Sequence, residues 1–194
     1  MKLSSPTVTS FLLELDKLKL VQRRSYIDGG TRLENSAEHS WHLAMAAWSI
    51  ANGLGLKVSI ERLLKLALIH DVGEIDGGDT FLYAAERHAA AEQERACVGR
   101  VAALCVDLLP DLQDLWEEQE RGETAEARLI KVIDRFLPLL HNLASEGKTW
   151  RAQKVRQSQV LGAHGFIAND FPELFVWIEE QVAVATRRGW LIDA

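Results

Sequence analysis

The chain has 194 residues, of which 47% are hydrophobic and 26% charged, and its net charge is −6. This is the size and balance of one ordinary domain with an adequate hydrophobic core, so a disordered or low-complexity chain is excluded. The acidic balance argues against a polynucleotide as partner, because neutralising many phosphates requires clustered Lys and Arg. A small anionic ligand bound in one local pocket is compatible with this charge.

Apolar residues recur at helical spacing along the whole sequence, beginning with Phe11 near the N-terminus. Ser36 and Ser59 stand where N-caps of the second and third helices are expected. No segment alternates apolar and polar residues over five or more positions, so no strand is expected. The sequence predicts an all-α fold, a single helical bundle-like domain over residues 1–194, with helices at about residues 11–20, 36–53, 60–69, 84–108, 111–121, 124–145, 150–168 and 172–188.

Two features concern the compartment of the protein. Cys97 and Cys105 lie in one predicted helix about 12 Å apart along its axis, too far for a disulfide, so reduced and buried thiols are expected. Residues 39–56 lack Asp, Glu, Lys and Arg, but they contain histidines, serines and glycines, which favours a buried core helix over a membrane span. The N-terminal residues lack the pattern of a signal peptide. We expect a cytoplasmic protein with no membrane partner.

Polar residues within apolar helical patterns mark a candidate site, because desolvating an unpaired charge is costly. His70-Asp71 ends the most apolar predicted helix, and His39 lies on an apolar row of the second helix. Asp134 lies on an apolar stripe four residues before Pro138, which is expected to kink that helix. Each of these residues alone is also compatible with a purely structural role. Together they offer two imidazole nitrogens and two carboxylates to one divalent ion.

Several sequence blocks occur in a characteristic order over about residues 20–180. They are ENSAEHS at 34–40, HDVGEIDGGD at 70–79, LWEE at 115–118, EARLIKVID at 126–134, Asn142, and GKTW at 147–150. This ordered series resembles the HD-domain metal-dependent phosphohydrolases, specifically their compact 5′-nucleotidase-like branch.

The resemblance implies that His39, His70, Asp71 and Asp134 bind one divalent metal ion. Their mixed nitrogen and oxygen donors suit Mn, Co, Ni, Fe or Zn. Binuclear relatives carry further histidines between the HD pair and the last aspartate, where this chain has only His88. One metal ion is therefore expected.

The acidic residues after the HD pair are the expected catalytic groups. The resemblance implies Glu74 as general acid/base and Asp79 as a carboxylate that contacts the sugar or orients Glu74. From composition alone, the same segment is also compatible with a solvated acidic loop. Its position directly after the HD pair, together with three nearby glycines that allow close approach of a ligand, favours the catalytic interpretation.

Substrate contacts are expected from the segment before the second helix. Arg24 lies fifteen residues before His39, where similar proteins place a phosphate-contacting arginine, and Arg23 and Arg32 are the alternatives. Members selective for deoxyribonucleotides carry an aromatic residue directly after that arginine, and here Ser25 takes the place. A small side chain leaves room for a ribose hydroxyl, so we expect a deoxyribonucleotide preference below about 100-fold.

The activity expected is removal of the 5′-phosphate from (deoxy)nucleoside monophosphates by metal-activated water. Two alternatives remain open: hydrolysis of a cyclic or pyrophosphorylated nucleotide, and a non-catalytic nucleotide-binding helical sensor. We also expect a homodimer, with aromatic residues available for the interface at Trp48, Trp116, Phe171, Phe175 and Trp177.

Overall fold

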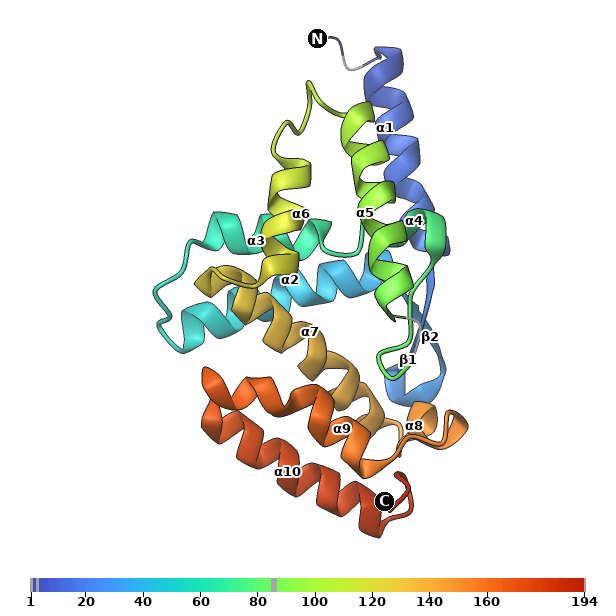
Figure 1. Ribbon diagram of the computed structural model, residues 1–194, viewed down its shortest axis with the longest axis vertical. Coiled ribbons are helices and arrows are strands. Elements are labelled where there is room, and N and C mark those ends of the chain that lie inside the picture. The colour runs from blue at the N-terminus through green and yellow to red at the C-terminus, as the bar shows by residue number, and fades with distance from the viewer. Residues whose placement is uncertain (1, 3, 85–86, 194) are drawn as a thin grey trace. The chain divides into compact units, whose positions relative to one another are not determined.

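The computed structural model describes residue 2 and residues 4–84 and 87–193, and helices make up most of this part of the chain (Figure 1). The all-α prediction is confirmed. The α-helices are α1 (Pro6–Asp16), α2 (Ser36–Gly53), α3 (Ile60–Ile69), α4 (Glu74–Gly77), α5 (Arg87–Leu104), α6 (Leu112–Arg121), α7 (Ala125–Ala144), α8 (Lys148–Ala152), α9 (Gln157–His164) and α10 (Pro172–Arg187), and the 3-10 helices are η1 (Lys17–Leu20), η2 (Asp28–Gly30) and η3 (Gly165–Asn169).

A short β-hairpin lies between η1 and α2, where no strand was expected. Strand β1 (Gln22–Ile27) pairs with β2 (Arg32–Asn35), and η2 forms the turn. The prediction is wrong here because the buried positions of β1 include Arg23 and Ser25, both polar. Burial alternates along the strand as the pleat requires, but polarity does not alternate with it.

Side chains at the helix starts explain where α2 and α3 begin. Asn35, one residue before the expected cap Ser36, accepts a hydrogen bond from the backbone N–H of Glu38, and the Glu38 carboxylate accepts one from the N–H of Asn35. This is a capping box. Ser59 caps α3 as predicted, accepting from the backbone N–H of Arg62. The caps define where the two helices that carry or lead into predicted site residues begin.

The described residues form two compact units. The first consists of Met1–Arg23, Asn35–Thr80 and Ala85–Ile133. Within it, α2 packs on α3, α3 packs on α6, and α5 contacts α1, α4 and α6 (Figure 1). Its fully buried apolar side chains include Leu43, Leu63, Leu66, Val98, Val101 and Trp116. One face of α3, the helix that leads into the HD pair, lies in this core.

The second unit consists of Arg24–Glu34, Phe81–Ala84 and Asp134–Ala194. Here α10 packs along α9 and η3, and α9 and α10 lie side by side in Figure 1. The expected helix at 150–168 is divided into α8, α9 and η3. The chain leaves the helical conformation after α8, where Lys154 has a left-handed φ of 53°.

The described residues also test what the sequence predicts about membrane-spanning helices and about the two cysteines. None of their helices, α2 included, has both the length and the apolar character that crossing a bilayer requires. Cys97 and Cys105 are free thiols, and both are buried.

Candidate metal centre and active site

Two histidines and an aspartate lie together where α3 ends beside α2. His39 lies on the first turn of α2, and His70 and Asp71 follow α3 directly. One possible ligand atom from each residue lies within 4.8 Å of the other two, and the two imidazole centroids are 5.3 Å apart. The three side chains are almost completely shielded from solvent. The structure therefore brings together three of the four predicted metal ligands.

The surroundings of His70 indicate which of its nitrogens can bind a metal. Its Nδ1 lies 2.8 Å from the backbone carbonyl oxygen of Ala67, which can only accept, so Nδ1 carries the hydrogen. Its Nε2 lies 3.0 Å from Oδ1 of Asp71. Two electron-pair donors at this distance repel unless a proton or a cation is shared between them. Because imidazole with carboxylate is a common donor set for divalent transition metals, the residues fit such an ion.

Arg23 lies beside this cluster. Its Nη1 is 2.8 Å from Oδ2 of Asp71, 4.0 Å from Oε1 of Glu74 and 3.9 Å from Oδ1 of Asp79. Only 9% of the Arg23 side chain is exposed. The structure therefore gathers one cation and two further carboxyl groups beside the metal donors.

Arg24, the expected phosphate contact, is exposed, whereas its neighbour Arg23 is buried. Successive residues of a strand point to opposite faces, so Arg24 is exposed where Arg23 is buried. The backbone carbonyl of Arg24 accepts a hydrogen bond of 2.8 Å from Oγ1 of Thr149. The alternative position Arg32 is also exposed. Of the three arginines considered from the sequence, the structure places Arg23 at the cluster.

Glu74 begins α4 and is buried. Its Oε2 accepts a hydrogen bond of 2.5 Å from Oγ of Ser36, a residue that the sequence marked only as a helix cap. Burial and the nearby charge of Asp71 raise the pKa of Glu74 well above its usual range. Burial acts in the same direction on Asp71, but the charges of His70 and Arg23 outweigh it and lower the pKa of Asp71 to about 2. The cluster therefore contains one strongly acidic carboxyl beside one that retains its proton more readily.

The remaining predicted ligand, Asp134, belongs to the second unit. It lies on α7, 16% of its side chain is exposed, and its Oδ2 accepts a hydrogen bond of 2.9 Å from Nη1 of Arg135. Its role as fourth ligand stays a prediction. The side chain of His88, considered for a second ion, lies outside the described residues.

Gly73 allows the segment that carries Glu74 to lie close to α5. A Cβ at Gly73 would lie 2.8 Å from Cβ and 3.0 Å from the carbonyl oxygen of Glu94, distances that require the backbone to move. We expect Gly73→Ala to lower the free energy of unfolding by about 1–3 kcal/mol, the usual cost of overpacking. Urea denaturation measures the change. Gly77→Ala is the matched control, because its Cβ would meet only the side-chain Oε1 of Gln93 at 3.4 Å. Equal losses in the two variants would contradict the steric argument.

Comparison with known proteins agrees with this geometry. The HD-domain family model matches residues 15–175. The chain is 30% identical to a 5′-deoxynucleotidase of Escherichia coli over 86% of this chain and 89% of that protein. It is also 30% identical to a 5′-deoxynucleotidase of Danio rerio, over 74% of each chain.

Solved structures show the same relationship. A protein of Magnetospirillum magnetotacticum, described as a predicted metal-dependent phosphohydrolase, superposes with a TM-score of 0.86 at 38% identity, over 95% of this chain and 94% of that one. An HD-domain phosphohydrolase of Listeria innocua shares the fold, with a TM-score of 0.60 at 14% identity over 93% of this chain and 99% of that one. The chain belongs to the HD-domain family of metal-dependent phosphohydrolases.

Proposed function

We propose that this phosphohydrolase removes the 5′-phosphate from (deoxy)nucleoside monophosphates. The observation that carries the proposal is the buried cluster in which His39, His70 and Asp71 adjoin a guanidinium and a second carboxyl group. Metal-dependent phosphoester hydrolysis uses a Lewis acid, a positive charge for the phosphate and a group that transfers a proton. The 5′-deoxynucleotidases among the relatives support the nucleotide substrate.

The donors of the metal site in this proposal are His39, His70, Asp71 and Asp134. A divalent ion bound there would polarise the phosphoryl group and lower the pKa of a bound water. Arg23 would donate to the phosphate, because its guanidinium lies beside these donors and a guanidinium binds phosphate through charged hydrogen bonds. In this role Arg23 replaces the expected Arg24.

Glu74 is the proposed general acid/base. Its carboxyl is buried, and one oxygen accepts from Ser36, so the other oxygen can exchange a proton with the substrate or the attacking water. Asp79 lies 3.9 Å from Arg23, and we assign it to the sugar or to orienting Arg23 and Glu74.

A panel of nucleotides tests the proposal directly. The purified chain is incubated with Mn²⁺, Co²⁺, Ni²⁺, Fe²⁺ or Zn²⁺ in turn, and chromatography identifies the phosphate, pyrophosphate or nucleotide formed from nucleoside 5′-monophosphates, 3′-monophosphates, cyclic nucleotides and pyrophosphorylated nucleotides. We expect phosphate from the 5′-monophosphates only. Cleavage of the cyclic or pyrophosphorylated compounds alone would support the other hydrolase. Nucleotide binding without turnover under every metal would support the sensor.

The sugar preference depends on Ser25. Ser25 is buried on the same face of β1 as Arg23, two residues away, so a larger side chain there would extend toward the same side. We expect the wild type to prefer dAMP over AMP by less than about 100-fold, and Ser25→Trp to increase the preference by excluding the ribose 2′-hydroxyl. The measurement is kcat/KM for both nucleotides. Gln22→Trp, on the exposed face of the strand, is the matched control. A strict deoxy preference in the wild type that Ser25→Trp leaves unchanged would contradict this assignment.

We also propose a homodimer, formed through α2. Trp41, Met45 and Trp48 follow one another at helical spacing and expose 65%, 41% and 43% of their surface. Trp116, by contrast, is only 1% exposed, so the expectation that it contributes to an interface is wrong. We expect Trp48→Glu to convert a dimer to a monomer in analytical ultracentrifugation. Val176→Glu on α10 is the control, because Val176 is similarly exposed but lies outside this stripe. A wild-type monomer would refute the dimer.

A further inference from the structure

We propose that Trp116 of α6 is a positioning residue for the metal donor His70, acting through the backbone of His70. The inference rests on the proposed metal site and adds a function for the LWEE block, which the catalytic assignment leaves unused. Each of the three polar or aromatic members of this block contacts α3 or α5 within the first unit.

The indole of Trp116 contacts His70 directly. Its Nε1 donates a hydrogen bond of 3.2 Å to the carbonyl oxygen of His70, and its ring is among the largest fully buried side chains of the protein. Carbonyls at the C-terminal end of a helix have no partner within the helix. The indole N–H can only donate, so this contact satisfies one such carbonyl at the residue that caps α3.

The same block contacts the other end of α3. Glu118 accepts a hydrogen bond of 2.9 Å from Nε of Arg62 and a second one from the Nη2 of that arginine, which makes the pair bidentate. Thr124 donates a further bond of 2.7 Å to the Glu118 carboxylate. Because Arg62 and His70 lie at opposite ends of α3, these contacts hold the helix against both translation along α6 and rotation.

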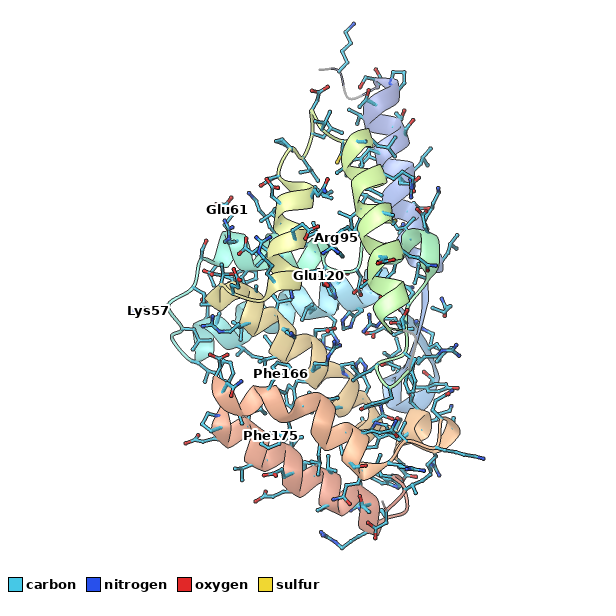
Figure 2. All side chains as sticks on the ribbon, viewed as in Figure 1. Lys57, Glu61, Arg95, Glu120, Phe166 and Phe175 are labelled. Carbon is cyan, nitrogen blue, oxygen red and sulfur yellow. The ribbon has the colours of Figure 1, made fainter. Side chains whose placement is uncertain are left out.

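Arg95 of α5 also contacts the indole of Trp116. Its Nε and Nη2 donate to Glu117 at 2.8 and 3.2 Å, and its guanidinium carbon lies 5.6 Å from the centre of the Trp116 ring. Arg95 lies between α5 and α6 (Figure 2). Arg95 therefore helps to hold the indole in the orientation in which it donates to His70.

The imidazole of His70 consequently has two anchors. Ala67 holds its Nδ1 through a carbonyl oxygen, and Trp116 holds the main chain from which the side chain projects. Together they set the position of Nε2 relative to Asp71. Partners that hydrogen-bond a metal-ligating side chain usually contribute 10–100-fold to metal affinity, and for a contact with the main chain of the ligand we expect the low end of that range.

Trp116→Phe tests the inference, because it retains most of the aromatic volume and removes the N–H. Mn²⁺ binding to the full chain is measured by isothermal titration calorimetry, with no nucleotide present. We expect a dissociation constant about tenfold higher than that of the wild type. The Mn²⁺ concentration that gives half-maximal turnover should rise by the same factor, while turnover at saturating Mn²⁺ changes little.

Trp150→Phe is the matched control. Trp150 is equally buried and its side chain is hydrogen-bonded to Tyr83 in the second unit, so the substitution removes a comparable bond away from His70. We expect this variant to lose thermal stability while its Mn²⁺ affinity stays within twofold of the wild type. A Trp116→Phe protein that loses stability but keeps wild-type Mn²⁺ affinity would overturn the positioning role.

A second variant guards against misfolding. If Trp116→Phe does not fold, Glu118→Gln is tested in its place. This substitution weakens the contact at the other end of α3, and we expect a smaller loss of Mn²⁺ affinity, about threefold. Unchanged affinity would then overturn the inference. Failure of the wild type to bind Mn²⁺ or any other divalent ion in the panel is a different result, which would reject the proposed function and this inference with it.

Discussion

Asp71→Asn is expected to lower turnover of a nucleoside 5′-monophosphate by more than about 100-fold. Even partners behind a metal ligand contribute 10–100-fold, so loss of a ligand should exceed that range. The amide oxygen of asparagine can still accept the hydrogen bond of Arg23, which at present spans 2.8 Å. The fold should therefore survive while the charge needed by the metal is lost. Phosphate release under saturating Mn²⁺ measures the effect.

Metal-dependent stability separates loss of the ion from loss of the fold. An ion at 100 times its dissociation constant stabilises the native state by about 2.7 kcal/mol, a rise of roughly 5–10 °C in Tm for a chain of this size. We expect that rise in the wild type and in Asp114→Asn, an exposed control on α6, but not in Asp71→Asn. Chelation by EDTA should abolish activity and Mn²⁺ or Co²⁺ should restore it. Full activity of the metal-free protein would reject the metal centre.

The sequence predicted most of the fold because its local signals agree with one another. Apolar residues at helical spacing and the cap Ser59 place α3 correctly, and the cap of α2, Asn35, lies one residue before the predicted cap Ser36. The hairpin was missed because strand β1 places polar residues at buried positions. A pattern of apolar and polar residues detects a strand only when burial follows polarity. The carboxylates beside the buried Arg23 come from the distant segment 71–79, and the local pattern of apolar and polar residues around Arg23 does not indicate those contacts.

The site could be predicted as a set of residue types but not as a geometry. His39, His70, Asp71 and Glu74 are identified by their order along the chain, and the structure brings them together. Arg24 was predicted as the phosphate contact from its distance to His39, a count that crosses the turn of the hairpin, whereas Arg23 lies at the cluster. A difference of one residue along a strand reverses the face to which the side chain points. The contact of Trp116 with His70 joins residues 46 positions apart, and only the packing of α6 on α3 reveals it.

Glu74→Gln is expected to lower turnover by about 10²–10⁴-fold, the usual contribution of general acid–base catalysis. Glutamine has nearly the same shape, and its amide oxygen can accept the hydrogen bond that Ser36 now donates at 2.5 Å. The substitution therefore removes proton transfer while it preserves the packing of α4. Mn²⁺ affinity and KM should remain near their wild-type values, because the proposed metal donors and Arg23 are unchanged.

Asp76→Asn is the matched control for Glu74, since both carboxylates lie on the single turn of α4. Asp76 is exposed and pairs with Arg100, whose Nε and Nη2 donate to it at 2.9 and 2.7 Å, away from the metal donors. Loss of that surface pair should cost at most about 1 kcal/mol of stability and leave kcat within a few-fold of the wild type. If Glu74→Gln turns over substrate as fast as Asp76→Asn, Glu74 transfers no proton. Its burial beside Asp71 would then serve only to hold Arg23 in place.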